Sequence, residues 1–207
     1  MSSNAETMGA RAPKRARGKQ RVAALLQAAA AVFAEKGYEA ATMTEIAARA
    51  GAPIGSLYQF FPVKEALADT LVQNYVALLV SDLEGIEARA RAIDAAVIVE
   101  ALFGLLRAHP RERAAVLPLA EARMDERTRR TTFRHMLRRH IAAILRAHAP
   151  VLPADTARDI AVVVLSLMKA ANTLSDEEGL PGRVARLREL QGLAVQYLAQ
   201  RLDASVS

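Results

Sequence analysis

The residue types best suited to chemistry lie between Thr42 and Lys64, where hydroxyl, ammonium and backbone N–H groups offer hydrogen bonds but form no legible catalytic set. Ile54, Gly55 and Ser56 open a short predicted helix, where small DNA-binding helices present their base-reading side chains. A serine hydroxyl can donate to or accept from a base edge, and an isoleucine can pack on a thymine methyl group. Glycine lets the backbone approach closely. These three residues are therefore the candidate base-reading positions.

A second set of residues has the chemistry needed to bind phosphates. Tyr58 lies one turn further along the same predicted helix and carries a hydroxyl, and Lys64 supplies a charge at the start of the next helix. Thr42 and Met43 begin the preceding helix, and N–H groups at a helix N-terminus favour a phosphate. We expect Thr42, Met43, Tyr58 and Lys64 to contact the DNA backbone.

Two short helices must position these side chains. Thr42 and Glu45 have the spacing of a capping box, which starts the first helix, and Gly51 ends it. Pro53 suits the first turn of the second helix, where its missing N–H costs nothing. The segment therefore predicts a helix-turn-helix, whose second helix can enter the major groove. Ile46, Leu57 and Phe61 are expected to hold the helices together.

The rest of the chain also has helical periodicity and no alternating run typical of a strand. A first helix is predicted from about Lys19 to Gly37, and a long fourth helix from about Lys64 to about Gly85. Further helices are predicted at roughly 92–108, 111–120, 123–148, 155–174 and 182–202, with breaks at Pro and Gly residues. The sequence thus predicts an all-α fold of about nine helices.

The order of motifs resembles the DNA-binding domain of the tetracycline-repressor (TetR) family. The resemblance covers about residues 19–79 and rests on Phe33-Ala34-Glu35-Lys36-Gly37-Tyr38, Thr42-Met43-Thr44-Glu45-Ile46-Ala47, Ala50-Gly51, Gly55-Ser56-Leu57-Tyr58 and Phe61-Pro62-x-Lys64-Glu65-Ala66-Leu67. It implies a homodimeric transcriptional repressor whose three-helix head binds palindromic double-stranded operator DNA. It also implies a C-terminal ligand-binding and dimerisation domain, here residues 80–207, and release of DNA when a small molecule binds.

Two positions depart from the family's pattern. Phe60 stands where the family often has a His or Tyr that reaches a phosphate, and Val63 stands where Ser, Asn or Asp usually caps the fourth helix. Loss of such a cap costs about 1 kcal/mol locally. We expect Phe60 to pack or to touch a sugar.

Basic residues are concentrated near the N-terminus. The first 62 residues hold eight basic and four acidic side chains, out of a formal net charge of +6 for the whole chain. This indicates a polyanionic partner or a solvated tail. Residues 1–18 are small, polar or basic and are predicted to be a disordered tail, which either lies along a minor groove or acts as a solubilising extension.

Composition makes other classes of protein less plausible. There is no cysteine, no run of about 18 apolar residues that could span a membrane, and no apolar core of a secretory signal at the N-terminus. A cytoplasmic location is the default expectation. The sequence has no spacing typical of metal ligands and no recognisable set of catalytic residues. We therefore expect that the protein has no cofactor and is not an enzyme.

The C-terminal region offers candidates for a ligand pocket, although plain core packing is the preferred interpretation of the apolar ones. They are Leu71, Tyr75, Leu102, Phe103, Leu106, Phe133, Met136, His140, Leu165, Met168 and Asn172. Aromatic residues make up only 4% of the chain, so an aromatic cage for a cation is hard to build. A neutral or acidic apolar ligand is the hypothesis that fits.

The last two predicted helices carry broad apolar surfaces, and residues 160–171 are apolar nearly all round. A monomer core accounts for this, but a seam between two copies is the preferred interpretation because C₂ symmetry is the commonest. Two rival functions stay open: a helix-turn-helix that binds a protein partner, and an all-α enzyme with a titratable pair in its C-terminal cavity.

Overall fold

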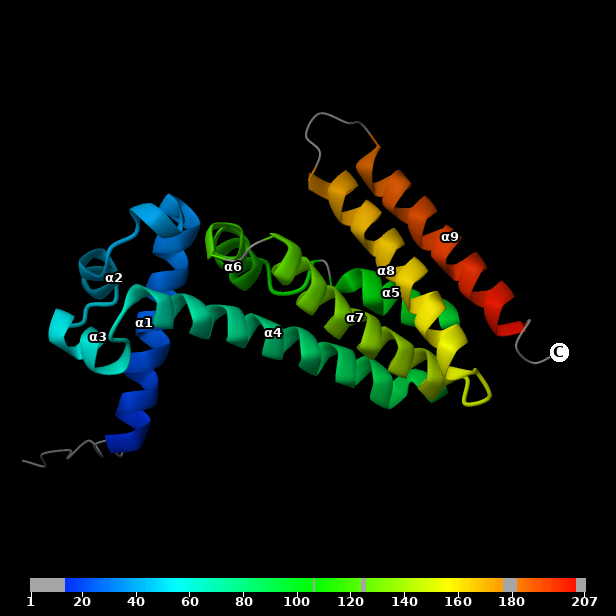
Figure 1. Ribbon diagram of the computed structural model, residues 1–207, viewed down its shortest axis with the longest axis horizontal. Coiled ribbons are helices and arrows are strands. Elements are labelled where there is room, and N and C mark those ends of the chain that lie inside the picture. Colours follow the sequence, from blue (N-terminus) through cyan, green and yellow to red (C-terminus); the bar gives the residue numbers. More distant parts are fainter. Residues whose placement is uncertain (1–13, 106, 124–125, 177–181, 204–207) are drawn as a thin grey trace, which may run out of the picture. The chain divides into compact units, whose positions relative to one another are not determined.

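The described part of the chain folds into helices joined by short turns. The computed structural model describes residues 14–105, 107–123, 126–176 and 182–203, and these ranges contain nine α-helices and one 3₁₀ turn but no strand. Figure 1 shows the helices in chain order, from α1 in blue to α9 in red. The predicted all-α fold of about nine helices is confirmed within these ranges.

The helix bounds agree with the sequence-based expectation to within a few residues for most elements. The helices are α1 (Lys14–Ala40), α2 (Met43–Arg49), α3 (Ile54–Phe60), α4 (Lys64–Arg89), the 3₁₀ turn η1 (Ala90–Ala92), α5 (Ala95–Gly104), α6 (Pro110–Arg123), α7 (Glu126–His148), α8 (Ala154–Asp176) and α9 (Arg183–Asp203). The fourth helix continues past Gly85 to Arg89, because one glycine within a helix costs only about 1 kcal/mol.

Internal contacts divide the chain into two compact units. One comprises residues 1–72 and 114–122 and is called the head unit below; the other comprises residues 73–113 and 123–207 and is called the C-terminal unit. This division and the predicted boundary of the head at residue 79 both fall inside α4. A boundary within a continuous helix carries no Pro or Gly signal, so the sequence does not reveal it.

The head unit has its own apolar core. Leu25, Ala29 and Phe33 of α1 are completely buried, as are Ile46 of α2 and Leu57 of α3. Phe61, Leu67 and Ala68 extend this core to the start of α4, and Leu119 of α6 joins it. The predicted small core of Ile46, Leu57 and Phe61 is confirmed.

The start of α1 corrects one prediction. Residues 14–18, expected to belong to a disordered tail, are the first turns of α1, which begins at Lys14 rather than near Lys19. Lys, Arg and Ala have high helix propensity, and they outweigh the cost of Gly18. The remainder of the predicted tail, residues 1–13, lies outside the described residues.

Gly37 ends the regular part of α1, as its sequence position predicts. Its backbone has φ 77° and ψ 172°, a conformation that is essentially restricted to glycine. The chain then turns through Tyr38 and reaches α2 at Met43. Gly51 has φ 60° and ends the turn that follows α2 in the same way. Both glycines are therefore required by the local backbone.

The C-terminal unit is built around α8. This helix packs against α7 on one side and α9 on another, while α5 packs against α9. The core contains Ile98, Phe103, Ile141, Ile160 and Leu198, all with at most 2% of their surface exposed. Two polar contacts join helix ends to other elements of this unit. His148 Nδ1, at the end of α7, lies 2.8 Å from the carbonyl oxygen of Ala90 in η1. His109 Nε2, just before α6, lies 2.8 Å from a carboxylate oxygen of Asp82 in α4.

None of the helices in the described ranges is both long enough and apolar enough to cross a bilayer.

We predict that Gly37→Ala lowers the free energy of unfolding by about 1–3 kcal/mol, because alanine is strained at this φ and ψ. Urea denaturation followed by circular dichroism measures the change. Gly18→Ala is the matched control in the same helix. Its added Cβ meets nothing within 4 Å and its φ is not positive, so stability is expected to rise by up to about 1 kcal/mol. Equal effects of the two substitutions would contradict the assignment of strain to Gly37.

Candidate nucleic-acid interface

The recognition helix α3 presents its predicted reading residues to solvent. Ile54 is 40% exposed and Tyr58 is 49% exposed, Gly55 is exposed, and Ser56 is half-buried. Leu57 is the one fully buried residue of this seven-residue helix. Large exposed apolar side chains on a soluble protein mark an interaction surface when they cluster. The predicted base-reading residues are thus brought together on an accessible face of the head unit.

Ser56 has a partner that the sequence did not indicate. Arg21 of α1 donates a hydrogen bond from Nη1 to Oγ of Ser56 over 3.2 Å, between residues 35 positions apart in the chain. Arg21 is exposed. A contact across such a separation leaves no local sequence signal, so only the folded head unit reveals it.

The start of α2 is fixed by the predicted capping box. The Oγ1 atom of Thr42 accepts from the Glu45 N–H over 3.2 Å, and the Thr42 N–H donates back to Glu45 Oε2 over 3.3 Å. The Glu45 carboxylate also pairs with Lys36. A phosphate at this helix end therefore has to meet the N–H groups of Met43 and Thr44, since those of Thr42 and Glu45 are already used.

The surrounding charges are paired across α1 and α2. The Lys36 ammonium, followed by the Thr42 hydroxyl, holds the pKa of the Glu45 carboxyl below its usual range. Arg49 Nη1 lies 2.6 Å from Glu35 Oε1, and this hydrogen bond lowers the pKa of the Glu35 carboxyl. Both pairs join the end of α1 to α2, so they steady the first helix of the helix-turn-helix.

Lys64 has a structural role that sequence reasoning missed. Its ammonium donates to the carbonyl oxygens of Tyr38 over 2.8 Å, Glu39 over 3.2 Å and Ala41 over 3.1 Å. It also lies 4.4 Å from the centre of the Tyr38 ring. A lysine ammonium has three donors, and all three point at these carbonyls. A phosphate would have to compete for them.

Tyr38 completes this attachment of α4 to the end of α1. Its hydroxyl donates to Glu65 Oε1 over 2.9 Å, and its ring centre lies 5.7 Å from that of Phe33. Tyr38 is buried. The first turn of α4 is thus held through a side-chain cluster, although Val63 offers no capping side chain.

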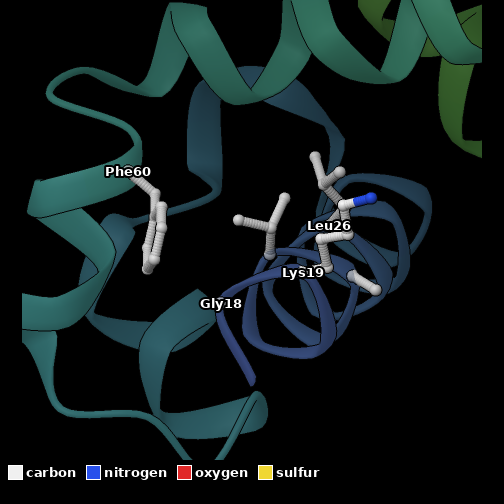
Figure 2. Close-up of a pocket in the computed structure, with 6 residues that line it drawn as sticks. Gly18, Lys19, Leu26 and Phe60 are labelled. Atoms are coloured by element: carbon white, nitrogen blue, oxygen red, sulfur yellow. The ribbon is translucent and has the colours of Figure 1, made fainter. Parts of the chain in front are cut away.

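Phe60 and Val63 remain exposed, at 40% and 52%. Phe60 faces a shallow apolar groove on α1 that is lined by Gly18, Lys19, Val22, Ala23 and Leu26. Figure 2 shows the Phe60 ring on the far side of this groove from Leu26 and Lys19. The expectation that Phe60 packs rather than binds a phosphate is consistent with this position.

Charge also favours an anionic partner for this face. No acidic residue occurs from Ile46 to Lys64, nor anywhere in α1 before Glu35. Segments that lack carboxylates do not repel a phosphate backbone. The first turns of α1 add the exposed side chains of Arg17, Lys19 and Arg21.

The predicted pocket residues of the C-terminal region have different environments. Leu102, Phe103, Leu165 and Met168 are buried in the core of the C-terminal unit, and Met136 packs against that core. Leu71 packs on the core of the head unit, because it lies on the part of α4 that belongs there. Phe133 is half-buried, and Leu106 lies outside the described residues.

Polar groups also gather in the C-terminal unit. Arg113 Nη2 donates to Asn172 Oδ1 over 2.7 Å. Burial raises the pKa of the Tyr75 hydroxyl, and the nearby Arg113 charge partly opposes this. The Nε2 atom of His140 is buried without a hydrogen-bond partner among the described residues. Tyr75, Asn172 and His140 were named from sequence, whereas Arg113 was not.

Comparison with known proteins places the strongest similarity in the head unit. Residues 25–71 match the family described as "Bacterial regulatory proteins, tetR family". The chain is 46% identical over 52 residues to the HTH-type transcriptional repressor KstR2 of Mycobacterium tuberculosis, a match covering 25% of this chain and 26% of that protein. It is 38% identical over 72 residues to the A-factor receptor protein of Streptomyces griseus, covering 35% of this chain and 26% of the receptor. The matches thus span about a quarter of these relatives.

Similarity of fold extends further along the chain. A solved structure described as the molecular basis for control of antibiotic production by bacterial hormones is 26% identical. It aligns with a TM-score of 0.58 over 85% of this chain and 97% of its own. The helical arrangement beyond the head therefore has a counterpart of known structure.

We predict that Lys64→Met destabilises the head unit by about 2 kcal/mol, because it removes three charged hydrogen bonds to carbonyl groups while keeping the apolar stem. Urea denaturation measures the change. Lys19→Met, on an exposed lysine of α1, is the control and is expected to change stability by less than about 0.5 kcal/mol. Equal losses would show that the carbonyl contacts do not stabilise the head.

We predict that the Glu45 carboxyl titrates below its usual pKa of 4.5 in the folded protein. Because the folded pKa is lowered, the stabilisation by this cap is present above about pH 4.5 and is lost as the pH falls through the folded value. Lys36→Met is expected to raise the pKa more than Thr42→Val does, since Lys36 is the larger cause. Carboxyl NMR titration measures all three proteins. A larger shift from Thr42→Val would contradict this ranking.

Proposed function

Because residues 25–71 match the model of the tetR family of bacterial regulatory proteins, we propose that this chain is a TetR-family protein and a sequence-specific DNA-binding transcriptional regulator. In this proposal it acts as a homodimeric repressor that leaves a palindromic operator when a small apolar ligand binds. The observation that carries the DNA-binding part is the face of α3, where Ile54, Gly55 and Tyr58 are exposed on a helix that contains no acidic residue.

The proposed DNA contacts follow from this geometry. Ile54, Gly55 and Ser56 read bases from the first turn of α3, and the Tyr58 hydroxyl contacts a phosphate. The start of α2 supplies backbone N–H groups at Met43. Lys64 contributes mainly by holding α4 on the end of α1, because its donors already point at carbonyl oxygens.

The named relatives favour a repressor over the two rival functions, a protein-binding helix-turn-helix and an all-α enzyme. KstR2 is named a transcriptional repressor, and the family consists of regulators rather than enzymes. An enzyme would need a titratable pair in the C-terminal unit, and burial raises the pKa of the Tyr75 hydroxyl there, which makes it a poor general base near neutral pH. Action on DNA implies a cytoplasmic location for the protein.

The homodimer is supported by apolar side chains that remain exposed on the last two helices. Val162 and Val163 lie on α8, and Val184 and Leu193 lie on α9. The opposite face of α8 is buried in the unit's own core through Ile160, Val164 and Met168. We propose that the exposed faces of α8 and α9 pair with those of a second copy, and that the expected seam of helices at 155–174 and 182–202 forms there.

The effector is proposed to be a neutral or acidic apolar molecule. The C-terminal unit has a mainly aliphatic core, and Arg113, Asn172 and Tyr75 supply polar atoms at its helices. One relative is named the A-factor receptor protein, which supports regulation by a bound signal.

We predict that selection from a library of random 30-base-pair duplexes with the full-length chain enriches a palindromic sequence. On the enriched duplex, Ser56→Ala is expected to lower discrimination at one base pair by about 1 kcal/mol or more. Tyr58→Phe is expected to weaken selected and random duplexes by the same factor, because a phosphate carries no sequence information. Fluorescence anisotropy at a fixed salt concentration measures both effects. Failure to enrich any sequence would refute the proposed function.

A further inference from the structure

The contact between Arg21 and Ser56 joins the basic start of α1 to the reading end of α3. We propose that Arg21 is a specificity-determining residue, which orients the Ser56 hydroxyl as a hydrogen-bond donor toward an acceptor on a DNA base edge. This inference rests on the proposed function, since it needs α3 to read DNA. It adds a residue outside the helix-turn-helix and defines the kind of base edge that Ser56 reads.

The direction of the hydrogen bond carries the argument. A guanidinium only donates, so in the pair Arg21 Nη1 donates and Ser56 Oγ accepts over 3.2 Å. With a lone pair of Oγ engaged by a cation, the hydroxyl proton is turned away from Arg21 and its acidity is increased. Ser56 is therefore biased toward donation. The base atoms that accept in the major groove are purine N7, guanine O6 and thymine O4.

The environment of Arg21 suits a residue at a DNA surface. Its side chain is exposed, and no acidic residue precedes Glu35 in α1. The guanidinium carries further N–H donors besides the one directed at Ser56. The same face of α1 also carries Arg17 one turn earlier, at the i, i+4 spacing that puts two side chains side by side. A phosphate next to the base that Ser56 reads would complete the site.

The helical start of α1 is what makes this placement possible. The backbone around Arg21 is fixed by the turns that begin at Lys14 and by Leu25 and Ala28, which are buried one and two turns further along the same face. A disordered tail ending near Lys19 would leave Arg21 in a fraying first turn. The two positions of the pair are therefore set by two helices that share the core of the head unit.

The competing explanation is that Arg21 ties α1 to α3 and affects only stability. The two roles separate in a double-mutant cycle on DNA. The probes are the enriched duplex and a random duplex of equal length, and the proteins are the full chain and its Arg21→Ala, Ser56→Ala and double variants. Thermal unfolding of each protein shows whether the head remains folded, and Arg21→Lys keeps the charge while losing the planar fork.

We expect Arg21→Ala to reduce the ratio of affinities for enriched and random duplexes about tenfold, at the same base pair as Ser56→Ala. In the Ser56→Ala background it should cause little further loss of that ratio, because the two residues act as one unit. Arg21→Lys should restore the overall affinity but not the ratio. Lys19→Ala removes a charge from another face of α1 and should weaken both duplexes equally.

Base analogues test the direction of the bond. Three analogues each remove one acceptor at the base pair identified by the cycle: 7-deazapurines remove N7, 2-aminopurine removes guanine O6, and 5-methylpyrimidin-2-one removes thymine O4. Loss of the acceptor that Ser56 contacts should lower the affinity for the enriched duplex as much as Ser56→Ala does. No loss with any of the three would overturn the assigned donor role. If selection yields an enriched duplex but Arg21→Ala lowers the affinities for enriched and random duplexes equally, the inference is refuted and the proposed function stands. Failure to enrich any duplex would refute both.

Discussion

The placement of the whole helix-turn-helix depends on the Lys64 ammonium at the end of α1. Three carbonyl oxygens, of Tyr38, Glu39 and Ala41, would otherwise be left at a chain turn that is partly buried, and Lys64 supplies a donor to each. Carbonyl groups without partners at a partly buried turn cost free energy, so this one side chain holds the start of α4 against the turn between α1 and α2. The Thr42 and Glu45 capping box fixes where α2 begins. The recognition helix α3 lies between these two fixed points in the chain.

Local signals in the sequence were sufficient where the structure depends on near neighbours. The Thr42 and Glu45 capping box, the turns at Gly37 and Gly51, and the buried Ile46 and Leu57 were all predictable from spacing alone. The start of α1 was not, because basic residues next to Gly18 are compatible with either a tail or a helix. The high helix propensity of the Lys, Arg and Ala residues explains why this segment is helical.

Residues that act across a long chain separation could not be assigned from sequence. Lys64 was predicted to contact a phosphate, and a lysine that caps carbonyls 23 to 26 residues upstream has the same local pattern. Arg21 gave no signal at all, since its partner Ser56 is 35 positions away. Likewise Leu71 shows helical spacing with the predicted pocket residues on α4, yet it packs on the other core. Periodicity gives the face of a helix but not the element that covers it.

The recognition helix contributes little to its own stability, and this leaves its side chains available for binding. It is two turns long, its N-cap Pro53 makes no side-chain hydrogen bond, and Leu57 is its one fully buried residue. An isolated helix of this length does not form in water, so packing through Leu57 and the neighbouring Phe61 imposes its geometry. Ile54 and Tyr58 are therefore not needed for the fold. Their exposure on a helix without carboxylates fits the proposed contact with DNA, which would cover this apolar surface.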